Sequence, residues 1–157
     1  SQVFIAHVGD CRAVLCNDGV AVQLTTDHKA NIKSEKARIE AAGGWVHNNR
    51  VNGALGVSRA FGDIQFKSFD EEPGHVISKP DFKHFVVERQ FEFVIMACDG
   101  LWDVFDCQEA VNFVRKKLAS TKSVERTAQE LVAKAIKRGT QVYKCLLISL
   151  CHYTTVF

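Results

Sequence analysis

The stretch VIMACDGLWDVF, residues 94–105, begins like a buried strand and ends in acidic residues. A mostly apolar run leads to Cys98, Asp99 follows it, and Asp103 lies four positions further on. A carboxylate at the end of a buried strand is held by rigid backbone, and carboxylate oxygen is a ligand that Mg²⁺ and Mn²⁺ prefer. The stretch therefore suggests part of a metal site, with Asp99 as its first candidate ligand and Asp103 as a second.

A further acid near the N-terminus has the same context. Asp10 follows an apolar run and Gly9, so Asp10 and Asp99 would meet if their strands ended at one edge of a sheet. The alternative is that Gly9-Asp10 and Asp99-Gly100 are ordinary turn dipeptides that bind nothing. Asp103 also has a structural alternative, as an acid stabilised by the dipole at a helix N-terminus. The residues alone leave these alternatives open.

The composition is that of an ordinary globular domain. The chain has 157 residues, of which 46% are hydrophobic and 24% charged, and its formal net charge is +2. A charge this small gives no strong attraction to nucleic acid or to an anionic membrane. No apolar run approaches the roughly 20 residues that span a bilayer. We expect a monomer with no nucleic-acid partner and no membrane partner, and a fold that is incomplete at the N-terminus, because Ser1 stands at the start of an apolar strand pattern.

The cysteines predict a reducing compartment. None of the six belongs to a C-x-x-C pair, which disfavours a zinc ribbon or a thioredoxin-like motif. Four lie among apolar residues, where a cysteine acts as a small hydrophobic side chain. We therefore expect reduced thiols and a location in the cytoplasm, the nucleus or both. The six are Cys11, Cys16, Cys98, Cys107, Cys145 and Cys151.

Several segments have the β-branched and aromatic composition of strands. The first three are joined by the Gly9-Asp10 turn and by Asn17-Asp18-Gly19, which is typical of a hairpin, so the pattern predicts an antiparallel meander. The fourth is the most apolar and is expected to be the most buried. The fifth is expected to be the final strand. These segments are residues 2–10, 11–16, 20–25, 91–98 and 145–150.

Three segments have the periodicity of helices: residues 34–44, 106–118 and 123–139. Ser34 is the expected N-cap of the first helix. Asp106 and Glu109 have the spacing of a capping box at the start of the second. Gly139 is expected to end the third. Antiparallel strands grouped together, with a pair of helices later in the chain, predict an α+β layered fold rather than a doubly wound parallel one.

The other polar and aromatic candidates have simpler interpretations. His28 is interpreted as a solvated loop histidine and Arg38 as a surface charge. Arg59 is a candidate either for phosphate binding through its planar fork of donors or for a buried ion pair with Asp63. Trp102 is expected to belong to the core.

The chain contains no P-loop, no G-x-G-x-x-G, no G-x-S-x-G and no H-E-x-x-H sequence, so nucleotide-binding, triad-hydrolase and zincin functions find no support. Five other stretches resemble, in order and spacing, the type 2C (PPM-type) metal-dependent Ser/Thr protein phosphatases. Any one of them would be weak, and five in order are specific. They are HVGDCRAVL (7–15), LTTDHKA (24–30), EKARIEAAGGWV (35–46), RVNGALGVSRAFGD (50–63) and VIMACDGLWDV (94–104).

The resemblance implies an α+β fold of two packed antiparallel β-sheets flanked by helices. It implies hydrolysis of phosphoserine and phosphothreonine on protein partners by a water that two Mg²⁺ or Mn²⁺ ions bridge and activate. By the match, Asp99 corresponds to a ligand of the metal core. Asp10 corresponds to an acid near an additional, weaker metal site, and Asp103 falls near that site too. No catalytic residue of the family other than these acids is matched in this chain.

Two departures separate the chain from the family pattern. The pattern has an upstream arginine that binds phosphate and an Asp-Gly-His-Gly-Gly segment, and neither occurs here. Further along, it has Asp-Asn where this chain has Val142-Tyr143. We therefore divide the chain into a partial phosphatase domain, 1–141, and a divergent tail, 142–157, which could supply a replacement strand. An altered splice site or reading frame is the expected origin of the tail.

One core ligand holds two hydrated cations poorly, because Mg²⁺ gives up its water reluctantly. Two hypotheses follow for the function. The chain is either a fragment of an active phosphatase with little activity of its own, or a non-catalytic pseudophosphatase or interaction module.

Overall fold

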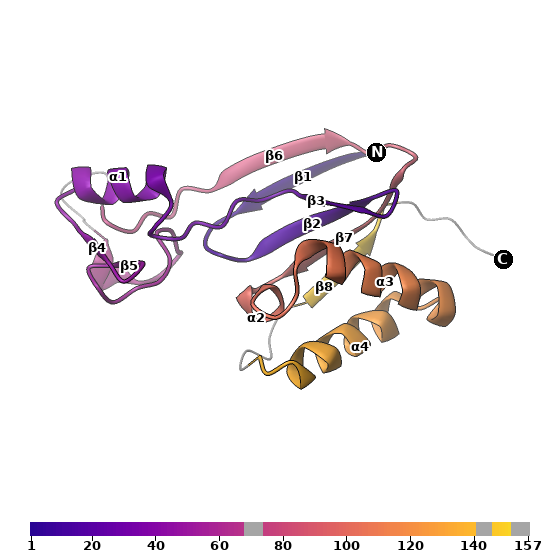
Figure 1. The fold of residues 1–157 in the computed structure, drawn as a ribbon. Coiled ribbons are helices and arrows are strands. Elements are labelled where there is room, and N and C mark those ends of the chain that lie inside the picture. The colour runs from indigo at the N-terminus through magenta and orange to yellow at the C-terminus, as the bar shows by residue number, and fades with distance from the viewer. Residues whose placement is uncertain (68–73, 141–145, 152–157) are drawn as a thin grey trace. The chain divides into compact units, whose positions relative to one another are not determined.

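The computed structural model describes residues 1–67, 74–140 and 146–151 (Figure 1). The chain divides into two compact units. The first unit comprises Ser1–Phe4, Cys11–Thr25 and Lys83–Phe157, and the second comprises Ile5–Asp10 and Thr26–Phe82. Within the described residues, no helix has the length and apolar character needed to cross a membrane.

The first unit contains a four-stranded antiparallel sheet. Its strands follow the order β3 (Val20–Gln23), β2 (Arg12–Asn17), β7 (Phe91–Ala97) and β8 (Leu146–Leu150). β2 and β3 form the predicted hairpin, in which Asp18 and Gly19 both have positive φ, as a two-residue primed turn requires. β7 is the buried strand that its apolar run predicts. The final strand expected from residues 145–150 is confirmed for β8, whereas Val142-Tyr143 lie outside the described residues.

Two long helices cover one face of this sheet (Figure 1). α3 (Cys107–Thr121) begins at the predicted capping box, where the Glu109 amide donates to the Asp106 carboxylate over 2.7 Å. α4 (Val124–Lys137) packs against α3 and β8 and is followed by Gly139 with φ +94°. Their buried side chains form one apolar core with those of the sheet. This core includes Val14, Phe93, Ile95, Val111, Val114, Leu131 and Ile148.

The predicted three-stranded meander is wrong in its first strand. β1 (Gln2–His7) forms a separate two-stranded sheet with β6 (Asp81–Val86). The reason is that β3 occupies one edge of β2 and β7 occupies the other, which leaves β2 no edge for β1. A few adjacent residues specify the hairpin between β2 and β3, whereas the partner of β1 is a strand far away in the sequence.

The second unit is built mainly from turns and short elements. These are α1 (Lys33–Ala41), β4 (Val46–His47), β5 (Arg50–Val51) and the 3₁₀ turn η1 (Ile64–Phe66). Ile39, Val51 and Val76 form its small apolar core. The expected N-cap is wrong: α1 begins one residue before Ser34, and its N-cap is Ile32, with no side-chain hydrogen bond.

Antiparallel sheets together with packed helices confirm the α+β class. The details that matter for function are the two strand ends that carry acids. One is the end of β7 in the first unit, and the other is the turn after β1 in the second unit.

Candidate functional site

Asp99 and Asp103 lie together on a single helical turn. α2 (Asp99–Trp102) starts directly after β7, with Cys98 as its N-cap in extended conformation. The Asp103 amide donates to the Asp99 carbonyl over 2.8 Å, which gives the i, i+4 relation that places two side chains on one side of a helix. Asp99 is half-buried and Asp103 is exposed. The helix-N-terminal alternative for Asp103 is wrong, since Asp103 is the C-cap of α2 and Asp106 is the N-cap of α3.

Trp102 anchors this turn in the core, as the sequence predicts. Its side chain is buried, and its indole Nε1–H donates to the Ala97 carbonyl over 3.0 Å. Arg12 at the start of β2 places its guanidinium 5.5 Å from the centre of the Trp102 ring and donates to Cys107 Sγ over 3.6 Å. No sequence pattern singled out Arg12, which puts a positive charge beside Trp102 on the turn that carries both acids.

Asp10 lies in the second unit, in a turn that His28 holds. Gly9 is buried and has φ +97°, a conformation that favours glycine. Its amide donates to His28 Nδ1 over 3.1 Å, and its carbonyl accepts from the His28 amide over 2.8 Å. Two hydrogen bonds to one residue therefore fix the backbone immediately before Asp10.

His28 is not the solvated loop histidine that the sequence suggested. Its side chain is 3% exposed, its Nε2 lies 3.1 Å from Asp81 Oδ2, and its ring stacks on His7 with 4.3 Å between centroids. Because Nδ1 accepts from Gly9, the proton of the neutral ring is on Nε2 and donates to Asp81. Burial lowers the pKa of His28 despite the opposing hydrogen bond with Asp81, so the ring is neutral at neutral pH. The sequence missed this role because Asp81 is 53 residues away.

A buried ion-pair network continues from Asp81. Arg59 donates from Nη1 to Asp81 over 2.8 Å and from Nη2 to Glu35 over 2.6 Å, and Arg38 donates to Glu35 over 3.1 Å. The predicted buried ion pair of Arg59 is thus present, but the predicted partner Asp63 is wrong. Arg38 is not a surface charge either, because its side chain is 16% exposed.

Glu35 is the centre of this network. Burial by itself would raise the pKa of its carboxyl group, but hydrogen bonds from Arg59, Ser58 and Arg38 hold that pKa at about 2. The hydrogen bonds that Arg59 donates to the Glu35 carboxylate raise the pKa of Arg59 further above its already high value. Every nitrogen of the Arg59 side chain donates within this network, so the structure favours the structural interpretation of Arg59 over phosphate binding.

A divalent cation such as Mg²⁺ or Mn²⁺ needs several oxygen ligands at once. Asp99 and Asp103 supply carboxylate oxygens, which are the correct type for Mg²⁺ or Mn²⁺. Among residues 1–67, 74–140 and 146–151, however, no group of three or more His, Cys, Asp or Glu side chains is arranged to hold a metal ion. The described residues therefore do not make a complete metal centre.

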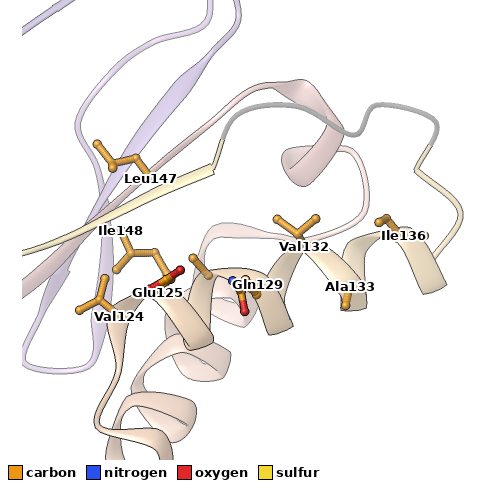
Figure 2. A pocket seen from close by; sticks show the side chains of 9 residues that line it. Val124, Glu125, Gln129, Val132, Ala133, Ile136, Leu147 and Ile148 are labelled. Atoms are coloured by element: carbon orange, nitrogen blue, oxygen red, sulfur yellow. The ribbon is translucent and has the colours of Figure 1, made fainter.

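An apolar groove of about 680 Å³ lies elsewhere in the first unit, between α4 and β8 (Figure 2). Val124, Val132 and Ile136 from α4 line it together with Leu147 and Ile148 from β8, and of these two strand residues Ile148 points toward α4. Among the lining residues that the structure describes, Glu125 alone carries a carboxylate. The groove lacks the clustered polar groups that phosphate chemistry needs, so the strand-end acids stay the candidate site.

The chain is similar to known protein phosphatases over most of its length. It matches the family model described as Protein phosphatase 2C over residues 1–142. It is 43% identical over 139 residues to Probable protein phosphatase 2C 47 of Oryza sativa subsp. japonica. The aligned region covers 88% of this chain and 36% of that protein. It is also 43% identical over 139 residues to Probable protein phosphatase 2C 27 of Arabidopsis thaliana, with 88% and 37% covered. The chain thus spans little more than a third of the length of these relatives.

Solved structures share the fold. A phosphatase from a pathogenic strain of Toxoplasma gondii superposes with a TM-score of 0.81 at 28% identity, covering 95% of this chain and 51% of that one. A C. elegans sex determining protein gives a TM-score of 0.85 at 26% identity, covering 96% and 37%. With the motifs, the sheet that ends in Asp99 and these similarities in agreement, the chain belongs to the protein phosphatase 2C family.

Proposed function

We propose that the chain forms part of the catalytic domain of a protein phosphatase that hydrolyses phosphoserine and phosphothreonine. The observation that carries the proposal is the position of Asp99, at the end of the buried strand β7 and at the start of α2. A rigid strand end of this kind holds a carboxylate where charge is needed and costs no reorganisation during the reaction. Family membership supports the same reaction class.

We propose roles for three acids in such a domain. Asp99 donates to the core of a Mg²⁺ or Mn²⁺ centre of two ions, and Asp103 and Asp10 lie near an additional, weaker site. The i, i+4 relation of Asp99 and Asp103 supports their acting together. The hydrogen bonds of His28 to Gly9 support a fixed position for Asp10. Since the described residues do not complete a metal site, we propose that the chain alone has little activity.

A second candidate function rests on that same shortfall of ligands. A member of this family with too few carboxylates for two cations would act as a pseudophosphatase or as an interaction module. The shortfall among the described residues supports this alternative, whereas the intact strand end with Asp99 supports the phosphatase.

The further expectations on partners and location belong to the same proposal. We propose phosphorylated proteins as substrates, a monomeric chain, and a location in the cytoplasm, the nucleus or both. The small net charge supports the absence of nucleic-acid partners. The cysteine pattern supports a reducing compartment.

The deciding experiment is release of phosphate from a phosphothreonine peptide in the presence of Mn²⁺. The chain should be assayed beside an extended version that carries the sequence flanking it in its gene, and both should be assayed with Asp99→Asn. We expect little turnover by the chain alone and Mn²⁺-dependent turnover by the extended protein, which Asp99→Asn abolishes without unfolding it. An extended protein that is folded and inactive would favour the pseudophosphatase, and activity retained by Asp99→Asn would remove Asp99 from the metal core.

A further inference from the structure

We propose that Cys11 and Cys98 are a redox-sensitive pair that forms a disulfide when the protein meets a peroxide. The site lies within the first unit and does not depend on the proposed function. Its position is notable in the sequence, because Cys11 directly follows Asp10 and Cys98 directly precedes Asp99. Both cysteines carry thiols in the structure.

The register of two strands places these residues opposite each other. In the antiparallel pair of β2 and β7, Arg12 lies opposite Ala97 and Ala13 lies opposite Met96. Arg12 and Ala97 form the last pair of this ladder, and continuing the same register by one step, just beyond both strands, brings Cys11 opposite Cys98. Cys98 follows the last residue of β7 and is the N-cap of α2, and its backbone is still extended, with φ −73° and ψ 175°.

Directly opposite residues of antiparallel strands have Cα atoms about 4.5–5.5 Å apart. A disulfide requires about 4.4–6.8 Å between the same atoms, so the register places the pair within bonding range without a shift of the backbone. Side chains also alternate between the two faces of a sheet. Cys11 therefore shares a face with Ala13 and Cys98 shares a face with Met96, and the Ala13–Met96 pairing puts both thiols on the same face.

Exposure and surroundings separate this pair from Cys16 and Cys107. Cys11 is exposed and Cys98 is half-buried, so a small oxidant reaches the pair. Cys16 is fully buried and lies opposite Phe93, so it has no thiol across the strands. Cys107 lies on the other face of the sheet, beside the Arg12 guanidinium, which donates to its sulfur over 3.6 Å.

The chemistry balances with one peroxide. The thiolate of one cysteine attacks an oxygen of hydrogen peroxide and breaks the O–O bond, which gives a sulfenic acid and, after proton uptake, one water. The second thiol attacks the sulfenic sulfur, the S–S bond forms, the S–O bond breaks and a second water leaves. Two thiols are oxidised by two electrons in total and one peroxide is reduced to two waters. Thioredoxin-type or glutathione-type dithiol exchange returns the pair to the reduced state.

The test is oxidation of the folded chain by an equimolar amount of hydrogen peroxide, followed by alkylation, trypsin digestion and mass spectrometry without reductant. We expect the peptide 1–12 linked to the peptide 90–115, lighter than their sum by two hydrogen atoms. Because peptide 90–115 holds both Cys98 and Cys107, the assignment needs variants. The link should persist in Cys107→Ser and Cys16→Ser and disappear in Cys11→Ser and Cys98→Ser.

Serine is close to cysteine in size, and thermal unfolding of each variant checks that it is folded. As a reference, the chain is oxidised in denaturant, which abolishes the pairing of β2 with β7. Disulfides should then form among several different pairs of cysteines. The proposal is overturned if the folded chain keeps its thiols under peroxide, or if Cys11 links to Cys107. It is also overturned if oxidation joins two chains through Cys11 rather than closing within one, which a non-reducing gel distinguishes.

Discussion

The amide of Gly9 donates to His28 Nδ1 over 3.1 Å, and the amide of His28 donates back to the Gly9 carbonyl over 2.8 Å. These two hydrogen bonds fix the backbone at Gly9, which has φ +97° and immediately precedes Asp10. The other ring nitrogen of His28 bonds Asp81, so one buried imidazole joins the turn to the ion-pair network of the second unit.

Replacement of His28 should therefore destabilise the protein strongly. We expect His28→Ala to lower the free energy of unfolding by about 2–4 kcal/mol, because it leaves the buried Gly9 amide without an acceptor and opens a cavity. His28→Asn should cost less, because its amide oxygen can take the place of Nδ1. Urea unfolding measures both, with His47→Ala as the control, since His47 is exposed and its replacement should change the free energy of unfolding by no more than about 0.5 kcal/mol. Equal effects at the two positions would show that the Gly9 turn does not need His28.

Stability should also depend on pH through His28. Burial lowers its pKa in the folded protein, whereas the unfolded chain has the ordinary value of about 6.5. The unfolded state therefore binds more protons on acidification. The contribution is fully present above about pH 6.5 and is lost as the pH falls through the folded pKa. Urea midpoints measured in steps from pH 8 to pH 5 should fall for the wild type and fall less steeply for His28→Asn, and parallel curves would exclude this residue as the source.

The two glutamates of α1 provide a matched pair. Glu35 is 5% exposed and neutralises Arg59 and Arg38, whereas Glu40 is 52% exposed and pairs with Lys36 on the surface. Glu35→Gln should cost about 3–5 kcal/mol, because it leaves buried charge uncompensated. Glu40→Gln should cost no more than about 0.5 kcal/mol. Thermal or urea unfolding compares them, and a small effect of Glu35→Gln would mean that solvent screens the network.

The capping box of α3 gives a prediction on the first unit. Asp106 accepts from the Glu109 amide, and Glu109 accepts in return from the Asp106 amide over 3.3 Å. Asp106→Ala should lower the free energy of unfolding by about 1 kcal/mol, whereas Asp106→Asn should change it little, because asparagine is an equally good N-cap. A loss in Asp106→Asn as large as that in Asp106→Ala would assign the effect to charge rather than to the cap.

The correct predictions concern interactions between residues that are close in the sequence, and the wrong ones concern interactions between residues that are far apart in it. The β2–β3 hairpin and the capping box of α3 were predictable because a few adjacent residues determine them. The pairing of β1 with β6 was not, because no local pattern names a partner more than 70 residues away. His28 was misassigned for the same reason: its hydrogen bonds to Gly9 and Asp81 span 19 and 53 residues.

The candidate site shows the same division. The sequence singled out Asp10, Asp99 and Asp103 because each follows or opens a recognisable turn. The structure adds that Asp99 and Asp103 share one helical turn. The role of Arg12 over Trp102 had no local signal, because it depends on β2 lying beside β7.

A Mn²⁺ titration of the ¹⁵N-labelled chain, followed by NMR line broadening, tests whether Asp99 is a metal-binding carboxylate. We predict weak binding, with the broadening strongest at the amides around Asp99 and Asp103. It should be lost in Asp99→Asn and unchanged in Asp106→Asn, which removes a nearby carboxylate charge but keeps the cap. Broadening that is centred elsewhere, or that survives Asp99→Asn in the folded chain, would contradict the claim.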